Sequence, residues 1–171
     1  TDAGNRDNTG ATGTNAIAIG PAATATKAQS IALGNSATAG GTDSIAIGNG
    51  SVAADKVAPV AIGRGTQANG DFSVALGGGN HQFVGAIANG VGTTALGTYT
   101  KTTAGENFQT AVGFGANTTK SNATAIGYNS AVSTEGGVAL GANSSSSTGR
   151  IVGYNPNDGR TNTYSALTGN V

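Results

Sequence analysis

The ten residues at 44–53, "SIAIGNGSVA", recur along the chain with small changes. Close relatives are "SIALGNSATA" at 30–39, "PVAIGRGTQA" at 59–68 and "NATAIGYNSAV" at 122–132. The glycines that close the motif are Gly20, Gly34, Gly48, Gly63, Gly77, Gly97, Gly113, Gly127 and Gly141, at intervals of 14, 14, 15, 14, 20, 16, 14 and 14 residues. Because a repeat unit this short buries its apolar face only by stacking on its neighbours, the sequence predicts a solenoid of nine coils.

Each unit contains two short alternating stretches. Before the glycine come a large residue, Ala and a large residue, as in 45–47, and this period of two with β-branched residues indicates a strand. Asn or a second Gly often follows, as at 49–50, and both tolerate the positive φ of a tight turn. A second stretch of small residues and a polar turn complete the coil. Nine coils stacked about 4.8 Å apart predict an all-β rod roughly 40 Å long, with parallel strands.

The large residues of the first strand are predicted to fill the inside of a flattened roll. This roll core is Ile17, Ile19, Ile31, Leu33, Ile45, Ile47, Val60, Ile62, Val74, Leu76, Leu96, Val112, Ile126, Val138 and Leu140. The alanines between them would then form an outward packing row, which is Ala18, Ala32, Ala46, Ala61, Ala75, Ala95, Ala111, Ala125 and Ala139. The opposite facing, with Ala inside and the large residues at a subunit interface, is the alternative. Either facing predicts self-association, since so thin a core is a weak basis for a monomer.

The composition argues against several other classes of protein. Charged residues make up 9% of the chain, and eight basic residues balance eight acidic ones, so there is no electrostatic footprint for nucleic acid or anionic lipid. The chain has no Cys, which fits an exported bacterial surface protein. No apolar run is long enough for a membrane helix and no signal peptide is present, so we expect a segment of a longer protein without direct membrane contact.

No pattern of catalytic, metal or cofactor residues stands out. The one histidine, His81, has no Ser-His-Asp spacing around it, so we expect no enzyme. Asp43, Asp55 and Asp71 fall in comparable inter-coil turns, where side-chain hydrogen bonds to the backbone are the expected role. Most units lack the Asp of calcium-binding repeats, so no metal is predicted.

Two intervals are longer than the period, with insertions at 78–94 and 98–110. Insertions in solenoids usually extend as loops on one face, so His81, Gln82 and Phe83 form a candidate ligand-facing loop, with Tyr99 and Phe108 also exposed. Alternatively the first insertion is a degenerate coil, because "GAIANG" at 85–90 weakly resembles the motif.

The repeated unit [Ser/Asn/Thr]-[Ile/Val]-Ala-[Ile/Leu]-Gly-x-x-[Ala/Ser/Thr]-x-Ala resembles the head repeat of YadA-like trimeric autotransporter adhesins over residues 16–153. The resemblance implies a left-handed parallel β-roll that assembles as a side-by-side homotrimer. It also implies a non-catalytic adhesin at the outer tip of an outer-membrane-anchored bacterial fibre, a virulence factor that attaches to collagen, fibronectin, laminin, cells or abiotic surfaces. Residues 1–15 are expected to be a leading cap and 154–171 the start of a connector.

An ice-binding or other structural β-solenoid is the alternative function. Ice-binding solenoids repeat Thr-x-Thr on a flat face of successive coils. Thr24-Ala25-Thr26 has no aligned threonine pair at 37–39 or 51–53, so this sequence fits the pattern poorly.

Overall fold

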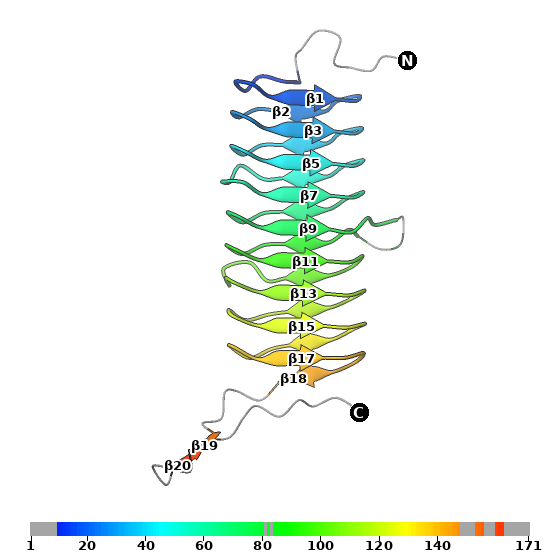
Figure 1. Cartoon of the computed structure of the whole chain (residues 1–171). Helices are drawn as coiled ribbons and strands as arrows, with labels where there is room; N and C mark the ends of the chain where they lie inside the picture. Colours follow the sequence, from blue (N-terminus) through cyan, green and yellow to red (C-terminus); the bar gives the residue numbers. More distant parts are fainter. Residues whose placement is uncertain (1–9, 81, 83, 148–152, 156–159, 163–171) are drawn as a thin grey trace.

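The computed structural model describes residues 10–80, 82, 84–147, 153–155 and 160–162, and in these it is a parallel β-solenoid (Figure 1). The described residues contain no helix. Each coil contributes one strand of three residues and one of two, joined by tight turns. The predicted all-β solenoid with coils of about 14 residues is therefore confirmed, with successive partners such as Ala32 and Ala46 in register.

The longer strands form the first sheet, in which each inner strand pairs on both sides. In stacking order these strands are β1 (Ile17–Ile19), β3 (Ile31–Leu33), β5 (Ile45–Ile47), β7 (Val60–Ile62), β9 (Val74–Leu76), β11 (Thr94–Leu96), β13 (Thr110–Val112), β15 (Thr124–Ile126) and β17 (Val138–Leu140).

The shorter strands form the second sheet, which lies behind the first in Figure 1. They are β2 (Thr24–Ala25), β4 (Thr38–Ala39), β6 (Val52–Ala53), β8 (Gln67–Ala68), β10 (Ile87–Ala88), β12 (Lys101–Thr102), β14 (Asn117–Thr118), β16 (Ala131–Val132) and β18 (Ser145–Ser146). Beyond the stack, β19 (Gly153–Asn155) and β20 (Arg160–Asn162) form an antiparallel pair.

The interior of the roll is lined by small side chains. Each coil turns four positions inward, and in the second full coil these are Ser30, Ala32, Ala37 and Ala39, all completely buried. The inward hydroxyls bond locally, since Ser30 Oγ donates to the Lys27 carbonyl at 2.6 Å. Because a buried polar group needs a partner, this bond to a carbonyl three residues earlier lets Ser and Thr share the interior with Ala.

The predicted roll core is wrong. The alanine packing row lies inside, at 0–2% exposure, and the large residues point outward. The outward residues are Ile17, Ile19, Ile31, Leu33, Ile45, Ile47, Val60, Ile62, Val74, Leu76, Leu96, Val112, Ile126, Val138 and Leu140, all half-buried or exposed. Two strands joined by tight turns leave too narrow a space for two Ile side chains per coil, whereas Ala methyl groups fit it. The alternative facing is the one the structure adopts.

The glycine that closes each first strand is required by close stacking. Gly48 has φ +125°, and a Cβ there would lie 2.7 Å from the carbonyl oxygen of Gly63 in the next coil. Only glycine combines this φ with so close a neighbour. One residue per turn also adopts the left-handed conformation, for example Ser36 and Asp43 at φ 54°.

The two long intervals add residues at opposite turns. Residues 85–89 carry β10, a regular second strand that pairs with β8 and β12, so the six extra residues of the first insertion lie in the preceding turn. This loop leaves the stack beside β9 (Figure 1). The second insertion widens the turn between β12 and β13, where buried Gln109 donates through Nε2 to the carbonyls of Thr103 and Glu106.

The ends of the predicted head are only partly described. Residues 1–9, 148–152, 156–159 and 163–171 lie outside the described residues, so the leading cap and the connector stay predictions. Residues 10–12 continue the second sheet, because Ala11 bridges Ala25 in parallel and Thr12 N donates to the Ala25 carbonyl at 3.0 Å.

Candidate functional site

An apolar surface runs the length of the first sheet. We call it the outer apolar face, and it consists of the outward residues at the first and third positions of each first-sheet strand. Its third-position side chains are aliphatic in every strand, and several are well exposed, including Ile19 at 56% and Leu140 at 48%. Because a contiguous apolar surface of this extent is unfavourable in water, it is a candidate protein interface.

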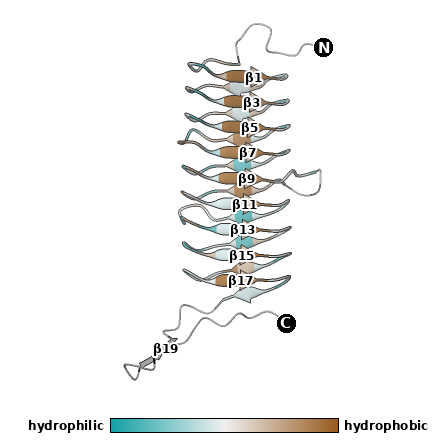
Figure 2. Cartoon of the chain, viewed as in Figure 1, coloured by the Kyte–Doolittle hydropathy of each residue, from teal (hydrophilic) through white to brown (hydrophobic). Residues whose placement is uncertain are grey.

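The outer apolar face changes character along the rod. Figure 2 shows strands β1 to β9 of the first sheet in brown, whereas β11, β13 and β15 are paler and β17 is brown again. The change is due to Thr94, Thr110 and Thr124, which replace Ile or Val at the first strand position and pair in register. The outer apolar face is therefore more apolar toward the first coils.

Aromatic side chains stack along the edge formed by the first turns, which join a first-sheet strand to the following second-sheet strand. The ring centroids of Tyr99 and Phe114 are 6.3 Å apart, and those of Phe114 and Tyr128 are 5.8 Å apart at an interplanar angle of 18°. We call these three residues the aromatic ladder. Their common position is visible in the sequence, because each of them follows a strand-closing glycine by one or two positions.

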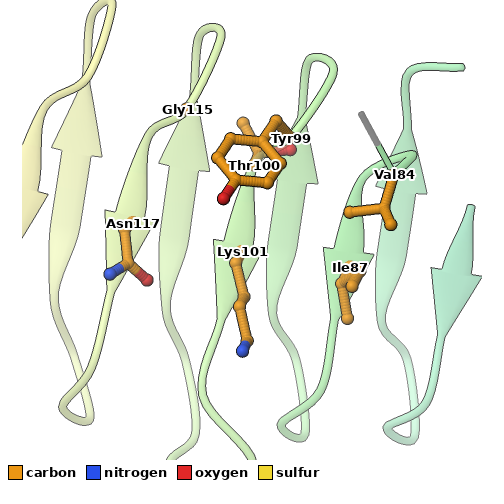
Figure 3. A pocket seen from close by; sticks show the side chains of 7 residues that line it. All are labelled: Val84, Ile87, Tyr99, Thr100, Lys101, Gly115 and Asn117. Carbon is orange, nitrogen blue, oxygen red and sulfur yellow. The ribbon is translucent and has the colours of Figure 1, made fainter. Parts of the chain in front are cut away.

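Beside the aromatic ladder lies a hollow of about 280 Å³, which we call the Tyr99 hollow. It is lined by Val84, Ile87, Tyr99, Thr100, Lys101, Gly115 and Asn117 (Figure 3). A second hollow of about 320 Å³ contains Arg64 and Gln67 and shares Val84 with the first. The two hollows therefore follow one another along the outer surface of the second sheet.

The candidate ligand-facing loop lies at the same edge. Gln82 is exposed, and its backbone N donates to Oδ1 of Asn80 at 2.8 Å. His81 and Phe83 lie outside the described residues, so their part in ligand binding stays a prediction. Tyr99 and Phe108, which were also expected to be exposed, are 52% and 62% exposed.

The opposite edge, formed by the second turns, carries the described carboxylates. Glu106 accepts hydrogen bonds from the side chain and the backbone N of Ser121, at 2.7 and 2.9 Å, and pairs with Lys120 at 3.2 Å. The Ser121 hydroxyl, with help from Lys120, lowers the pKa of Glu106 from its ordinary value of 4.5. Asp71 Oδ1 accepts from Val57 N at 2.8 Å, so this carboxylate bonds to the turn of a neighbouring coil rather than its own.

The described residues give little support to a metal site, a membrane-spanning helix or an ice-binding face. Among the described residues, no three or more His, Cys, Asp or Glu side chains gather where a metal ion could bind. No helix in the described part of the chain is long and apolar enough to span a membrane. Thr24 and Thr38 pair in register on the second sheet, but Val52 and Gln67 continue that row, so no threonine array develops there.

A comparison with known protein families gives a match to this chain. The family model of the YadA head domain repeat (2 copies) matches residues 11–37, 25–51, 39–56, 60–80, 110–130 and 119–144, which together cover more than half of the chain. The unmatched stretch 81–109 contains most of both insertions, where the repeat spacing is longer. No curated protein matches the sequence.

Proposed function

Because this chain belongs to the YadA head domain family, we propose that it is the non-catalytic head of a bacterial surface adhesin. Three copies would lie side by side at the outer tip of an outer-membrane-anchored fibre. The head would present a rigid polar surface to collagen, fibronectin, laminin, host cells or abiotic surfaces. The family suggests a surface-exposed adhesin; the trimer, the location at the tip and the ligands are the proposal.

The observation that carries the proposal is the outer apolar face. A single chain leaves aliphatic side chains such as Ile19, Leu33 and Leu140 between 41% and 56% exposed along a whole sheet. Burying such a side chain contributes about 1.5–3 kcal/mol relative to leaving it in water. Since the interior of the roll holds mainly Ala, Ser and Thr, contact between chains supplies the large apolar core that the roll lacks.

The fold also supports a presenting role. Strands in the middle of both sheets pair on each side, so few strand edges are open within the stack. A rod held by continuous parallel pairing keeps surface residues of different coils at fixed spacing. Such a scaffold suits attachment through contacts distributed over several coils.

The test is the solution mass of the chain, measured by light scattering together with circular dichroism. The proposal expects a β-rich species near three times the 16.3 kDa chain mass. Ile47→Lys, on the outer apolar face, should give a smaller, still β-rich species. Gln67→Lys, the matched change on the outward row of the second sheet, should leave the mass unchanged.

A stable monomer of the unmodified chain at high protein concentration would contradict the trimer. The ligand part is tested separately, by attachment of the assembled protein to surfaces coated with collagen, fibronectin or laminin. Attachment to none of these and to no host cell would leave a structural solenoid without the proposed adhesive function.

A further inference from the structure

We propose that the Tyr99 hollow and its neighbour around Arg64 form a binding site for an acidic oligosaccharide. The sugar ring would lie against Tyr99, and its carboxylate or sulfate groups would pair with Lys101 and Arg64. The site deepens the proposed adhesive function by naming a ligand class, and it rests on that function for its biological role.

The first step is the shape and lining of the Tyr99 hollow. Tyr99 and Lys101 lie in the middle of the lining, between Val84 and Ile87 on one side and Asn117 on the other (Figure 3). A concave site with an aromatic ring and a few convergent polar groups is typical of small-ligand binding. A pyranose has apolar C–H groups on its faces and hydroxyls around its rim, so it matches a ring bordered by an ammonium and an amide.

The second step is the backbone of Tyr99. This residue has φ 63°, in the left-handed region, and the corresponding place in other coils is taken by small or turn-forming residues, namely Ala22, Ser36, Gly50, Gly65, Gly115, Asn129 and Asn143. Gly and Asn adopt this conformation readily, but a bulky aromatic residue there is strained. Phe72 and Phe108 adopt the same conformation in second turns, so the strain supports a role for Tyr99 only together with the hollow that its ring borders.

The third step is the charge on this side of the molecule. Among the described residues, the charged side chains on the first-turn edge and the outer surface of the second sheet are Arg64 and Lys101, both positive. The described carboxylates, which are Asp43, Asp55, Asp71, Glu106 and Glu135, belong to the second turns at the opposite edge. An anionic ligand therefore meets attraction here without repulsion from a facing carboxylate.

The fourth step is the spacing. The outward residues Gln67, Ile87, Lys101 and Asn117 are aligned by consecutive strand pairing. Arg64 and Lys101 belong to coils two steps apart, so they are separated by about 10 Å along the rod. This separation is close to the length of a disaccharide unit in an extended acidic glycan. Acidic groups on neighbouring disaccharide units can therefore pair with Arg64 and Lys101.

The fifth step is accessibility in the proposed trimer. The two hollows lie on the second sheet, whereas the outer apolar face belongs to the first. Burying the Lys101 ammonium against another chain would require a partner charge. The outer surface of the second sheet is therefore less favourable for assembly than the outer apolar face. The site therefore stays open to ligand when three chains associate through the first sheet.

The experiment is calorimetric titration of the full chain with a heparin-derived hexasaccharide, and with neutral cellohexaose for comparison. Tyr99→Asn places a residue that this turn position accepts elsewhere, so the fold is kept while the ring is lost. It should weaken hexasaccharide binding about tenfold or more. Lys101→Gln should weaken it about fivefold and reduce its salt dependence.

Two variants at the opposite edge are matched controls. Phe108→Asn also replaces an exposed aromatic residue in the left-handed conformation, at φ 54°, and Lys56→Gln also removes one exposed positive charge. Both should leave hexasaccharide affinity within about twofold. Cellohexaose should bind at least about tenfold more weakly than the acidic chain.

Equal losses for Tyr99→Asn and Phe108→Asn, equal losses for the two lysine changes, or equal affinity for cellohexaose would overturn the site. So would the absence of hexasaccharide binding by the unmodified chain. The mass of each sample is measured by light scattering in parallel. An intact trimer without glycan binding refutes this site alone, whereas a monomeric unmodified chain refutes the proposed assembly.

Discussion

The coils up to β10 and the coils from β11 onward follow the same backbone path with different side chains. In the first set the interior is mostly Ala and Ser, with Pro59 and Thr66 in one coil, and Ile, Val or Leu occupies both outward positions of each first-sheet strand. In the second set Thr102, Thr118, Val132 and Ser146 replace alanines inside, and Thr has the first outward position in three strands. The glycine column, the alanine row, the left-handed turn residues and the aliphatic third position of each first-sheet strand are common to both.

The comparison indicates that the fold and the proposed assembly depend on different positions. The close stacking and the narrow interior are set by the shared small residues, so the coil tolerates changes elsewhere. The first outward positions differ between the two sets, and in the proposed assembly they would determine how strongly a partner chain is held. Variants at shared positions should therefore damage both halves equally, whereas variants at outward positions should separate them.

The largest effect is expected inside the roll. Ala75→Asp and Ala111→Asp each place a carboxylate at a position with 0% exposure and no cation nearby in the interior. An unpaired buried charge costs about 3–5 kcal/mol, so both variants should lose their β signal and cooperative melt in circular dichroism. Gln67→Asp, at an exposed outward position, is the control and should melt like the unmodified protein. If Ala111→Asp kept its β signal and cooperative melt while Ala75→Asp lost them, the interiors of the two sets of coils would not be equivalent.

The glycine column should give the next largest effect. Gly48→Ala would force a positive φ on Ala and would place its Cβ against the Gly63 carbonyl. Gly141 also has a positive φ, +109°, but nothing lies within 4 Å of a Cβ at that position. Gly48→Ala and Gly141→Ala both strain the backbone, but only Gly48→Ala also creates a steric clash. Urea unfolding should therefore show Gly48→Ala to be less stable than Gly141→Ala by about 2 kcal/mol. Gly113→Ala should resemble Gly48→Ala, and a result close to Gly141→Ala would mean that coils of the second half separate more easily.

The outward positions should distinguish the halves most directly. Ile45→Thr makes an early coil resemble a later one, and Thr110→Ile does the reverse. If the outer apolar face holds chains together, Ile45→Thr should weaken the assembly by about 1 kcal/mol per chain and Thr110→Ile should strengthen it similarly. Light scattering over a dilution series measures both. Identical dissociation for the two variants would show that the proposed interface lies elsewhere.

A smaller effect is expected from the polar interior of the later coils. Thr118 Oγ1 is buried without a hydrogen-bond partner, whereas Thr102 Oγ1 accepts from Asn89 N at 2.8 Å. Thr118→Val should therefore stabilise the protein by about 1 kcal/mol, and Thr102→Val should destabilise it by a similar amount. Urea midpoints decide the matter, and a loss of stability in Thr118→Val would contradict the assignment.

The smallest effect concerns acid stability of the wide second turn. The pKa of Glu106 is lowered in the folded protein, below its ordinary value of 4.5. The hydrogen bonds of the ionised carboxylate therefore stabilise the fold at a pH above the unfolded-state pKa. This contribution is lost as the pH falls through the folded-state pKa. The melting temperature of Glu106→Gln should then fall less than that of the unmodified protein between pH 6 and pH 3. Equal falls would remove Glu106 from the acid response.

Much of this architecture was predictable from the sequence. The 14-residue interval predicted the coils, the period-two alternation predicted the strands, and the two long intervals predicted where the coil would depart from its repeat. The candidate loop was predicted in part, since Gln82 is exposed at an edge of the rod. The aromatic ladder was missed because Tyr99, Phe114 and Tyr128 come together only when three turns are stacked.

The sequence by itself determined the coil, its register and its turns, because glycine spacing and alternation act through the local backbone. It did not determine which face of the first strand lies inside, since Ile45-Ala46-Ile47 alternates equally well in either direction. Only the tertiary structure decided that, because two sheets joined by tight turns enclose room for Ala46 but not for its neighbours. The same closure turns the aliphatic side chains outward and thereby creates the surface through which we propose that this head assembles.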